Sequence, residues 1–301
     1  MVRIWEQLIQ WIDSDAKSES NRDPMRPQVV RVLPFIMVHL ACLSVFWVGW
    51  SWIAVSIAFL LYVVRMFAIT AFYHRYFSHR SFKTHRLTQF IFALLGGTAT
   101  QRGALWWAAH HRHHHKQSDR QGDSHSPVQD GFWWSHCLWF TCDAHFPTDY
   151  DRVRDFSRYK ELVFLNRFDL LIPFTFAILL FAFGWTLNFF FPGLGTSGWQ
   201  MVVWGYFIST VFLAHATFTI NSLAHKWGTR PYDTPDQSRN NFFLAILTLG
   251  EGWHNNHHRF PSSSRQGLEW WQLDMTFIGL KLLSSLGIIW DLKPAPVRRT
   301  P

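Results

Sequence analysis

Long apolar stretches alternate with polar, histidine-rich stretches along the chain. Between Val32 and Leu61 there is no Asp, Glu, Lys or Arg, and this run is too long for a single membrane crossing. It therefore predicts a hairpin of two spans around the uncharged turn 49–51, and a second hairpin is predicted around the uncharged segment 192–198. The four predicted spans run from about Leu33 to Val48, from Trp52 to Tyr73, from Leu170 to Phe191 and from Trp199 to Asn221. These lengths suit a bilayer crossing, which takes about 20 residues.

The charges predict the orientation of these spans. Both inter-span turns lack Lys and Arg, whereas the tails and the segment between the hairpins are rich in them. By the positive-inside rule both turns face outward, and both termini and the polar segments face the cytoplasm. We therefore expect a multi-pass integral membrane protein, in the inner or plasma membrane if the source is bacterial. The predicted class is all-α, with four transmembrane helices and a helical cytoplasmic cap.

We expect one domain over residues 1–301 with no dividing linker. Its predicted parts are an N-terminal interfacial segment 1–30, a first hairpin 33–73, a first cap segment 74–167, a second hairpin 170–221 and a second cap segment 222–301.

Three further segments are apolar without being full spans. At the N-terminus, the apolar side chains from Ile4 to Ile12 fall on one side of a helix, which is typical of a helix lying on a membrane surface. The segment 86–105 is broken by two glycines and is interpreted as a helix within the cap or dipping into the membrane. The segment 268–290 mixes aromatic and polar residues and predicts a second interfacial helix.

Composition supports the membrane interpretation. The chain has 18 Trp and 29 Phe, and rings at this density are typical of a membrane interface. The formal charge of +8 fits an anionic lipid surface, and no nucleic-acid-binding motif accompanies it. The three cysteines form no CxxC pair, which argues against a disulfide framework or a thiolate metal site.

The 17 histidines carry the candidate chemistry, because most of them gather at the cytoplasmic ends of predicted spans or in the cap. The pattern H-x-x-H-H occurs twice, and positions i, i+3 and i+4 share one helical face, so each triplet is expected to converge on a shared point. In the first cluster the two histidines are five residues apart, about 140° on an ideal helix, so the helix must end or bend between them. The clusters comprise His74 and His79, His110 to His115 (with the triplet His111, His114 and His115), His254, His257 and His258, and the element from Asn221 to His225.

Imidazole ligands suit zinc, copper, iron or nickel, and nine histidines exceed the four ligands of one tetrahedral zinc. The set therefore suits two metals of higher coordination number, and iron is the natural choice for redox chemistry. His39 and His215 are interpreted as packed or hydrogen-bonded membrane residues, and the roles of His110 and His113 are left open. Carboxylates are expected on the outer imidazole nitrogens, with Asp130, Asp233 and Glu251 as candidates.

These motifs resemble those of the membrane fatty-acyl desaturases, especially the acyl-CoA delta-9 (stearoyl-CoA-type) branch. The resemblance rests on HRYFSH at 74–79, HRHHH at 111–115, NSLAH at 221–225 and GEGWHNNHH at 250–258, which come in the family's order. It implies a di-iron enzyme that introduces a cis double bond into a long saturated acyl chain with O₂ and an external electron donor. That donor would resemble a ferredoxin, a rubredoxin or a b-type cytochrome.

The resemblance also implies roles for particular residues. The implied iron ligands are His74, His79, His111, His114, His115, His225, His254, His257 and His258, with Asn221 acting through water. Gln101, Trp107 and Thr217 match residues that line the bend of the family's acyl tunnel, and Tyr62 matches a position near its closed end.

The chain departs from the animal acyl-CoA enzymes before its second cluster, where Ala109-His110 replaces Arg-Asp, and near Cys142-Asp143, where a basic pair that contacts CoA is replaced. The CoA contacts therefore do not carry over, and the acyl carrier, a CoA thioester or a lipid, stays open. Arg152, Arg154 and neighbouring basic residues could contact a phosphate-bearing head group or be solvated. Two alternatives remain open, a membrane di-iron fatty-acyl or alkane hydroxylase and a membrane protein that binds or transports metal.

Overall fold

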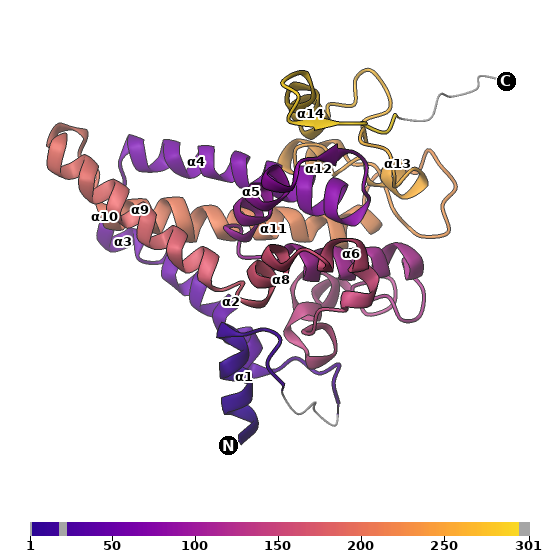
Figure 1. Ribbon diagram of the computed structural model, residues 1–301, viewed down its shortest axis with the longest axis horizontal. Helices are drawn as coiled ribbons and strands as arrows, with labels where there is room; N and C mark the ends of the chain where they lie inside the picture. Colours follow the sequence, from indigo (N-terminus) through magenta and orange to yellow (C-terminus); the bar gives the residue numbers. More distant parts are fainter. Residues whose placement is uncertain (1, 18–22, 295–301) are drawn as a thin grey trace.

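A computed structural model describes residues 2–17 and 23–294 (Figure 1). Residues 1 and 18–22 of the predicted segment 1–30, and residues 295–301 of the predicted segment 222–301, lie outside the described residues. Long helices occupy one half of the molecule in Figure 1, and the shorter helices of a cap occupy the other half. The described residues include four helices long and apolar enough to cross a membrane. This confirms the predicted all-α class with four candidate spans, and the cytoplasmic orientation of the cap stays a prediction.

The four candidate spans are built from consecutive helical elements. They are Val29–Val48 (α2 Val29–Cys42 and α3 Val45–Val48), Trp52–Ser78 (α4 Trp52–Phe67 and the π-helix η1 Ala68–Ser78), Leu171–Phe190 (α9), and Gly198–His225 (α10 Gly198–Gln200, the π-helix η7 Met201–Ile208, α11 Ser209–Ser222 and the 3₁₀ turn η8 Leu223–His225). The second and fourth spans continue beyond their predicted ends at Tyr73 and Asn221. Their polar last turns are stable because the cap encloses them, and every residue of η1 is buried.

The cap is a set of short helices joined by irregular segments. Its elements are α5 Arg86–Gly97, α6 Ala104–Gln117, η2 Trp134–Leu138, η3 Trp139–Thr141, η4 Asp143–His145, η5 Tyr150–Val153, α7 Arg154–Ser157, α8 Lys160–Arg167, α12 Phe242–Leu247, α13 His254–Arg259 and α14 Met275–Ser285. A two-stranded antiparallel ribbon pairs β1 Lys83–Thr84 with β2 Ile289–Trp290. The turn between α9 and α10 contains η6 Pro192–Leu194.

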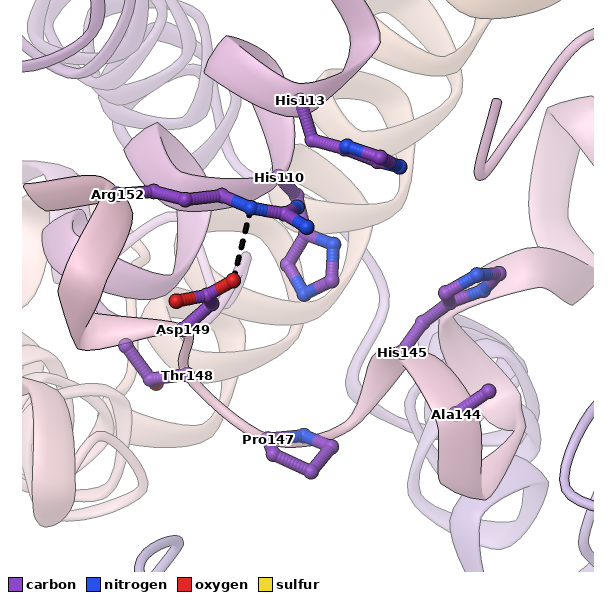
Figure 2. A pocket seen from close by; sticks show the side chains of 8 residues that line it. All are labelled: His110, His113, Ala144, His145, Pro147, Thr148, Asp149 and Arg152. Atoms are coloured by element: carbon purple, nitrogen blue, oxygen red, sulfur yellow. Dashed lines mark ion pairs between the residues drawn. The ribbon is translucent and has the colours of Figure 1, made fainter. Parts of the chain in front are cut away.

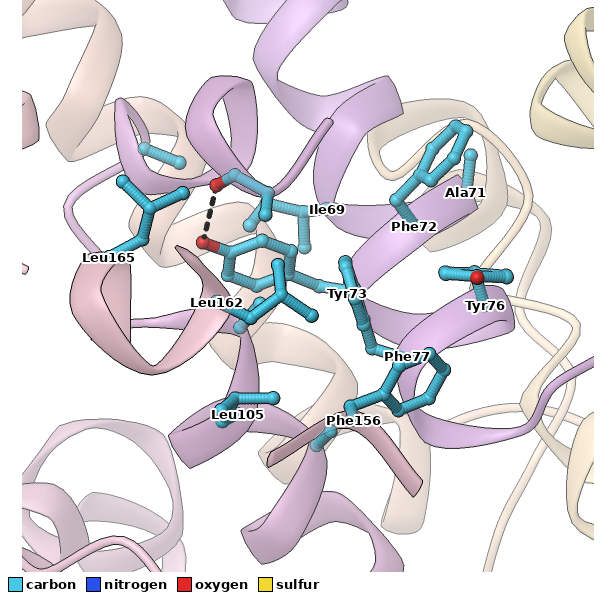
Figure 3. Close-up of a cluster of buried hydrophobic side chains, with 14 of the residues drawn as sticks. Ile69, Ala71, Phe72, Tyr73, Tyr76, Phe77, Leu105, Phe156, Leu162 and Leu165 are labelled. Atoms are coloured by element: carbon cyan, nitrogen blue, oxygen red, sulfur yellow. Dashed lines mark hydrogen bonds between the residues drawn. The ribbon is translucent and has the colours of Figure 1, made fainter. Parts of the chain in front are cut away.

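The main apolar core surrounds η1 and joins this span to the cap (Figure 3). Phe72, Tyr73 and Phe77 are at most 1% exposed. The Tyr73 hydroxyl donates a hydrogen bond to the Ala93 carbonyl at 3.1 Å, and a Cβ at Gly96 would collide with the Tyr73 ring. Gly96 thus allows close packing of α5 on η1, Gly97 allows a close approach to Ile172 of α9, and α5 is not a fifth span.

The N-terminal helix α1 (Val2–Ile12) presents its apolar side away from the protein. Ile4, Trp5 and Ile12 are more than half exposed, whereas Gln7 is buried and donates to Asp143 Oδ1 at 3.3 Å. The apolar side agrees with the predicted amphipathic pattern, and its contact with lipid stays a prediction. Helix α14 lies within the predicted segment 268–290 and likewise exposes apolar side chains such as Ile278 and Leu282.

Candidate metal centre

Five histidines from three elements bring their Nε2 atoms to one point. His74 and His79 come from η1 and its C-terminal cap, two more come from α6, and one comes from α13. The members of this first group are His74, His79, His111, His115 and His257. The widened π-helical turn brings the first two together, since the His79 amide donates to the His74 carbonyl, five residues back, at 3.3 Å. The helix also ends at His79, as the five-residue spacing requires.

The spacing of these nitrogens fits ligands around a single metal ion. Successive Nε2···Nε2 distances are 2.8 Å (His79 to His111), 3.0 Å (His111 to His115), 2.9 Å (His115 to His257) and 2.9 Å (His257 to His74). For a metal–nitrogen bond of about 2.1 Å, ligands at right angles lie about 3.0 Å apart and tetrahedral ligands about 3.4 Å apart. Hydrogen bonds alone cannot account for these contacts, because one ring proton cannot bridge an Nε2 atom to two neighbouring Nε2 atoms at once. The group therefore fits one cation with more than four coordination positions.

A second group adjoins the first. It comprises His114, His225, His254 and His258. The Nε2 atoms of His225 and His254 lie 3.0 Å apart. The Nε2 of His258 is buried and lacks a hydrogen-bond partner among the described residues, as expected of a nitrogen reserved for a ligand.

The prediction that each H-x-x-H-H triplet converges on one point was wrong. From α6, His111 and His115 join the first group and His114 joins the second, while from α13 only His257 joins the first. Adjacent helical residues differ by about 100° in direction, so consecutive histidines point toward different groups. Each triplet thereby bridges both groups, and the ring centroids of His115 and His258 are 4.5 Å apart.

Carboxylates hold the outer nitrogens of four of these rings. Nδ1 faces Glu251 in His74 (2.5 Å), Asp123 in His114 (2.9 Å), Asp119 in His225 (2.8 Å) and Asp236 in His258 (2.7 Å). Such pairs place the proton on Nδ1 and leave Nε2 free to bind a metal. Of the three carboxylates predicted from the sequence, only Glu251 makes such a contact. The sequence analysis did not identify Asp119, Asp123 or Asp236. Asp119 and Asp123 follow α6 within one turn-forming stretch, which could have indicated a return toward the histidines.

The electrostatics of the site favour a charged Glu251 carboxylate and neutral imidazoles in the rings that have no carboxylate partner. Burial raises the pKa of Glu251, but the charges of His74 and Arg75 outweigh burial and hold this pKa at about 2. Burial, reinforced by neighbouring imidazoles, lowers the pKa of the rings without a carboxylate partner well below the usual range, and these are His79, His111, His115, His254 and His257. Metal binding requires neutral imidazole.

Two of the residues expected to line an acyl tunnel lie beside each other, and a third lies beside the first group. Gln101 Nε2 donates to Thr217 Oγ1 at 2.7 Å, and the Trp107 ring stacks on His111 with centroids 4.9 Å apart. Tyr62 is further from the histidines in the chain, and its hydroxyl donates to the Leu247 carbonyl at 2.6 Å. The tunnel itself stays a prediction. So does the water-mediated role of Asn221, which lies in α11 one turn before His225.

Three histidines outside both groups form a hydrogen-bonded chain. His39 Nε2 and His215 Nε2 are 2.9 Å apart, and His215 Nδ1 and His136 Nε2 are 3.0 Å apart. This confirms that His39 and His215 are hydrogen-bonded residues. Because His215 uses both nitrogens for different partners, the chain does not enclose a metal position.

A cavity of about 260 Å³ lies beside the histidine cluster 110–115 (Figure 2). It is lined by His110, His113, Ala144, His145, Pro147, Thr148, Asp149 and Arg152. His110 is buried, and neither of its ring nitrogens has a hydrogen-bond partner among the described residues. His113 Nε2 lies 2.8 Å from the Gly122 carbonyl, and Arg152 pairs with Asp149 at 2.8 Å.

The fold and the site together define a helical protein with four helices that could cross a membrane and two adjoining histidine groups that could hold metal ions. Comparison with known proteins narrows this class, because the family model for fatty acid desaturases matches residues 17–281. The chain belongs to the fatty acid desaturase family. It is therefore an enzyme, an oxidoreductase of lipid metabolism.

Named relatives share most of the chain. It is 38% identical to an sn-1 stearoyl-lipid 9-desaturase of Synechocystis over 93% of this chain and 85% of that protein. It is 39% identical to acyl-CoA 5-desaturase AL21 of Anemone leveillei, over 87% of this chain and 78% of that protein. It is 37% identical to Delta-9 acyl-lipid desaturase 1 of Arabidopsis thaliana, over 89% of this chain and 84% of that protein.

Proposed function

We propose that this chain is a delta-9 desaturase that introduces a cis double bond into a long acyl chain at a histidine-ligated di-iron centre. The observation that carries the proposal is the pair of adjoining imidazole groups, one of five and one of four rings, at the ends of two candidate spans and in the cap. The delta-9 position is supported by the names of the relatives from Synechocystis and Arabidopsis thaliana. The name of the Anemone relative gives position 5 instead, so the experiment must determine the position of the double bond.

In this proposal His74, His79, His111, His115 and His257 hold one iron, and His114, His225, His254 and His258 hold the other, with Asn221 contributing through water. The donor set fits iron, since imidazole suits this metal and the nitrogen spacing favours more than four coordination positions. When bound, the two irons supply the activation of O₂ that removal of hydrogen from an unactivated methylene requires. Side-chain acid–base chemistry alone cannot remove such a hydrogen.

The chain's own residues orient the reaction. The carboxylates of Asp119, Asp123, Asp236 and Glu251 hold four imidazoles with Nε2 directed inward. Trp107 covers His111, and the bridge from Gln101 to Thr217 would bend the acyl chain so that one pair of carbons faces the metals. Apolar walls would exclude water from the oxidant.

The acyl carrier is proposed to be a lipid or a CoA thioester, both of which occur in the relatives' names. A lipid carrier is supported at Cys142-Asp143, where the animal acyl-CoA enzymes have a basic pair that contacts CoA. Asp143 is instead buried in an ion pair with Arg31 at 2.8 Å, so this position offers no positive charge to CoA. The cavity of Figure 2 offers the unpartnered His110 ring and Arg152 to a polar head group. The site would face the cytoplasm, where a ferredoxin, rubredoxin or b-type cytochrome could supply electrons.

Expression in a host without desaturases tests the proposal. Mass spectrometry of fatty-acid methyl esters should reveal a new cis double bond at the delta-9 position, and the purified protein should contain two irons per chain. Labelled acyl-CoA and labelled glycerolipid, supplied separately to protein in nanodiscs, identify the carrier. Hydroxylated acids without unsaturation would contradict a desaturase and support a hydroxylase.

A further inference from the structure

Arg112 of helix α6 uses every N–H group of its guanidinium. An arginine has five such donors in a fixed, planar fork. Its Nε donates to the Ser78 carbonyl at 3.0 Å, and its Nη2 donates to the Phe77 carbonyl at 2.6 Å. Its Nη1 donates to the Arg152 carbonyl at 2.7 Å. The remaining two donors bind the two carboxylate oxygens of Asp155, at 2.8 and 2.9 Å.

Two of these bonds close the end of the helix that carries the first histidines. Phe77 and Ser78 are the last residues of η1, and His79 is its C-terminal cap. The last carbonyls of a helix have no partner within the helix, so the Arg112 donors satisfy them. The chain neighbour of Arg112 is His111, whose Nε2 lies 2.8 Å from the Nε2 of His79. One side chain thus ties together the two elements that supply this pair of imidazoles.

The two histidine groups differ in how their rings are held. Within the described part of the chain, three of the four rings of the second group have a carboxylate on Nδ1, whereas in the first group only His74 has one. A carboxylate on the outer nitrogen fixes the orientation of a metal-binding ring. The geometry of the first group therefore depends more strongly on how η1 and α6 are held against each other.

The charge of Arg112 does not explain its place beside the site. A positive group next to a metal position repels the bound cation. Asp155 offsets this charge through the ion pair at 2.8 Å, in which each side chain is 20% exposed. The pair keeps the five-donor fork and compensates its charge, which indicates a geometric role.

We propose that Arg112 is a positioning residue that holds His79 against His111 and thereby maintains the metal position of the first group. The inference rests on the proposed function, in which each group holds one iron. Lysine cannot take this role, because its ammonium places three donors at one point and cannot span two carbonyls and a carboxylate. The second group keeps its carboxylates when Arg112 is replaced, so its iron should be retained.

The test measures iron retention by the full chain in nanodiscs. Protein loaded anaerobically with isotopically enriched Fe(II) is equilibrated against increasing concentrations of a chelator, and metal content and Mössbauer spectra are recorded. R112Q and R112K are compared with R86Q. Arg86 forms a similar forked pair with Glu161 at 2.6 and 2.7 Å, between α5 and α8, and belongs to neither group. Glu251→Gln and Asp236→Asn, which alter the outer partner of one ring in each group, assign the two iron signals.

We expect R112Q and R112K to lose the iron of the first group at a chelator concentration at least tenfold lower than wild type. The iron of the second group, and both irons in R86Q, should stay within twofold of wild type. The role of Arg112 is rejected if both irons weaken equally, if R112K retains iron as wild type does, or if R86Q has the same effect.

Asp155→Asn keeps the arginine and weakens only one side of the fork, so it decides the matter if R112Q does not fold. It should lose the same iron at a chelator concentration between those of wild type and R112K. Retention of the first-group iron at the wild-type level in this variant would overturn the proposal. Wild-type protein that holds no iron in either group would instead contradict the proposed function.

Discussion

Glu251 faces Nδ1 of His74 at 2.5 Å and is held in turn by Arg75, the residue next to that histidine. Arg75 is 1% exposed and contacts Glu251 at 3.0 Å and Asp274 at 2.9 Å. Asp274 also accepts a hydrogen bond from the backbone N–H of Gln266 at 2.7 Å. A buried network from the last turn of a span to the C-terminal part of the cap thus fixes the orientation of one imidazole in the first group.

Replacing Glu251 with Gln should weaken metal binding at the first group by about 10- to 100-fold, because the outer partner of His74 loses its charge. Metal affinity is measured by titration of the metal-free protein with Fe(II) under anaerobic conditions. Asp233→Asn is the matched control, since Asp233 is exposed and was a sequence candidate that contacts none of these histidines. Equal affinities in the two variants would remove Glu251 from the site.

Replacing His257 with Ala should abolish the new double bond while the protein stays in the membrane. His257 contacts both His74 and His115 through Nε2, so its loss opens the first group on two sides. Products are read as fatty-acid methyl esters, and membrane content by immunoblot. His85→Ala serves as control, because His85 is exposed, contacts the Trp290 ring and belongs to neither group. Full activity of the His257 variant would contradict its assignment as a ligand.

Replacing Tyr62 with Ala should shift the accepted acyl chains toward greater length, if this side chain closes the tunnel. The ring is half-buried, and the loss of its hydroxyl also removes the contact with Leu247. Competition between saturated chains of increasing length measures the shift. Tyr62→Phe removes only the hydroxyl and should keep the wild-type length profile. A Tyr62→Ala profile identical to wild type would place Tyr62 outside the tunnel.

His110 should make the folded protein sensitive to acid. Burial, with the charges of His145 and Arg102, lowers the pKa of His110 from 6.5 to about 3. Between these values the unfolded chain takes up a proton that the folded protein does not, so the free energy of unfolding falls by about 1.4 kcal/mol per pH unit below pH 6.5. Above pH 6.5 this histidine is neutral in both the folded and the unfolded chain, so it lowers the free energy of unfolding no further.

His110→Phe removes that proton uptake and should retain about 2 kcal/mol more stability than wild type at pH 5, relative to their difference at pH 7.5. Urea unfolding of the metal-free proteins in detergent at both pH values measures this. His113→Phe is the control, because the His113 ring is only half-buried and bonds to the Gly122 carbonyl. The same pH dependence in His110→Phe and wild type would show that His110 is protonated in the folded state.

Much of this protein follows from patterns that are local in the chain. Long apolar stretches predicted the four spans, because a bilayer requires each crossing to be apolar and continuous. Histidine spacing predicted a two-metal site, since the residue types near one another already restrict the chemistry. The glycines at 96–97 predicted a break, and α5 ends at Gly97, where added Cβ atoms would meet Tyr73 and Ile172.

The tertiary structure decided what depends on residues far apart in the chain. Which histidines share a metal position depends on how α6 and α13 lie against η1, and the division of each triplet followed from that packing. Asp119, Asp123 and Asp236 were not predicted, because many carboxylates are available and the folded loops decide that these three meet Nδ1 atoms. Periodicity describes one helix at a time, whereas coordination joins side chains from several elements at a single point.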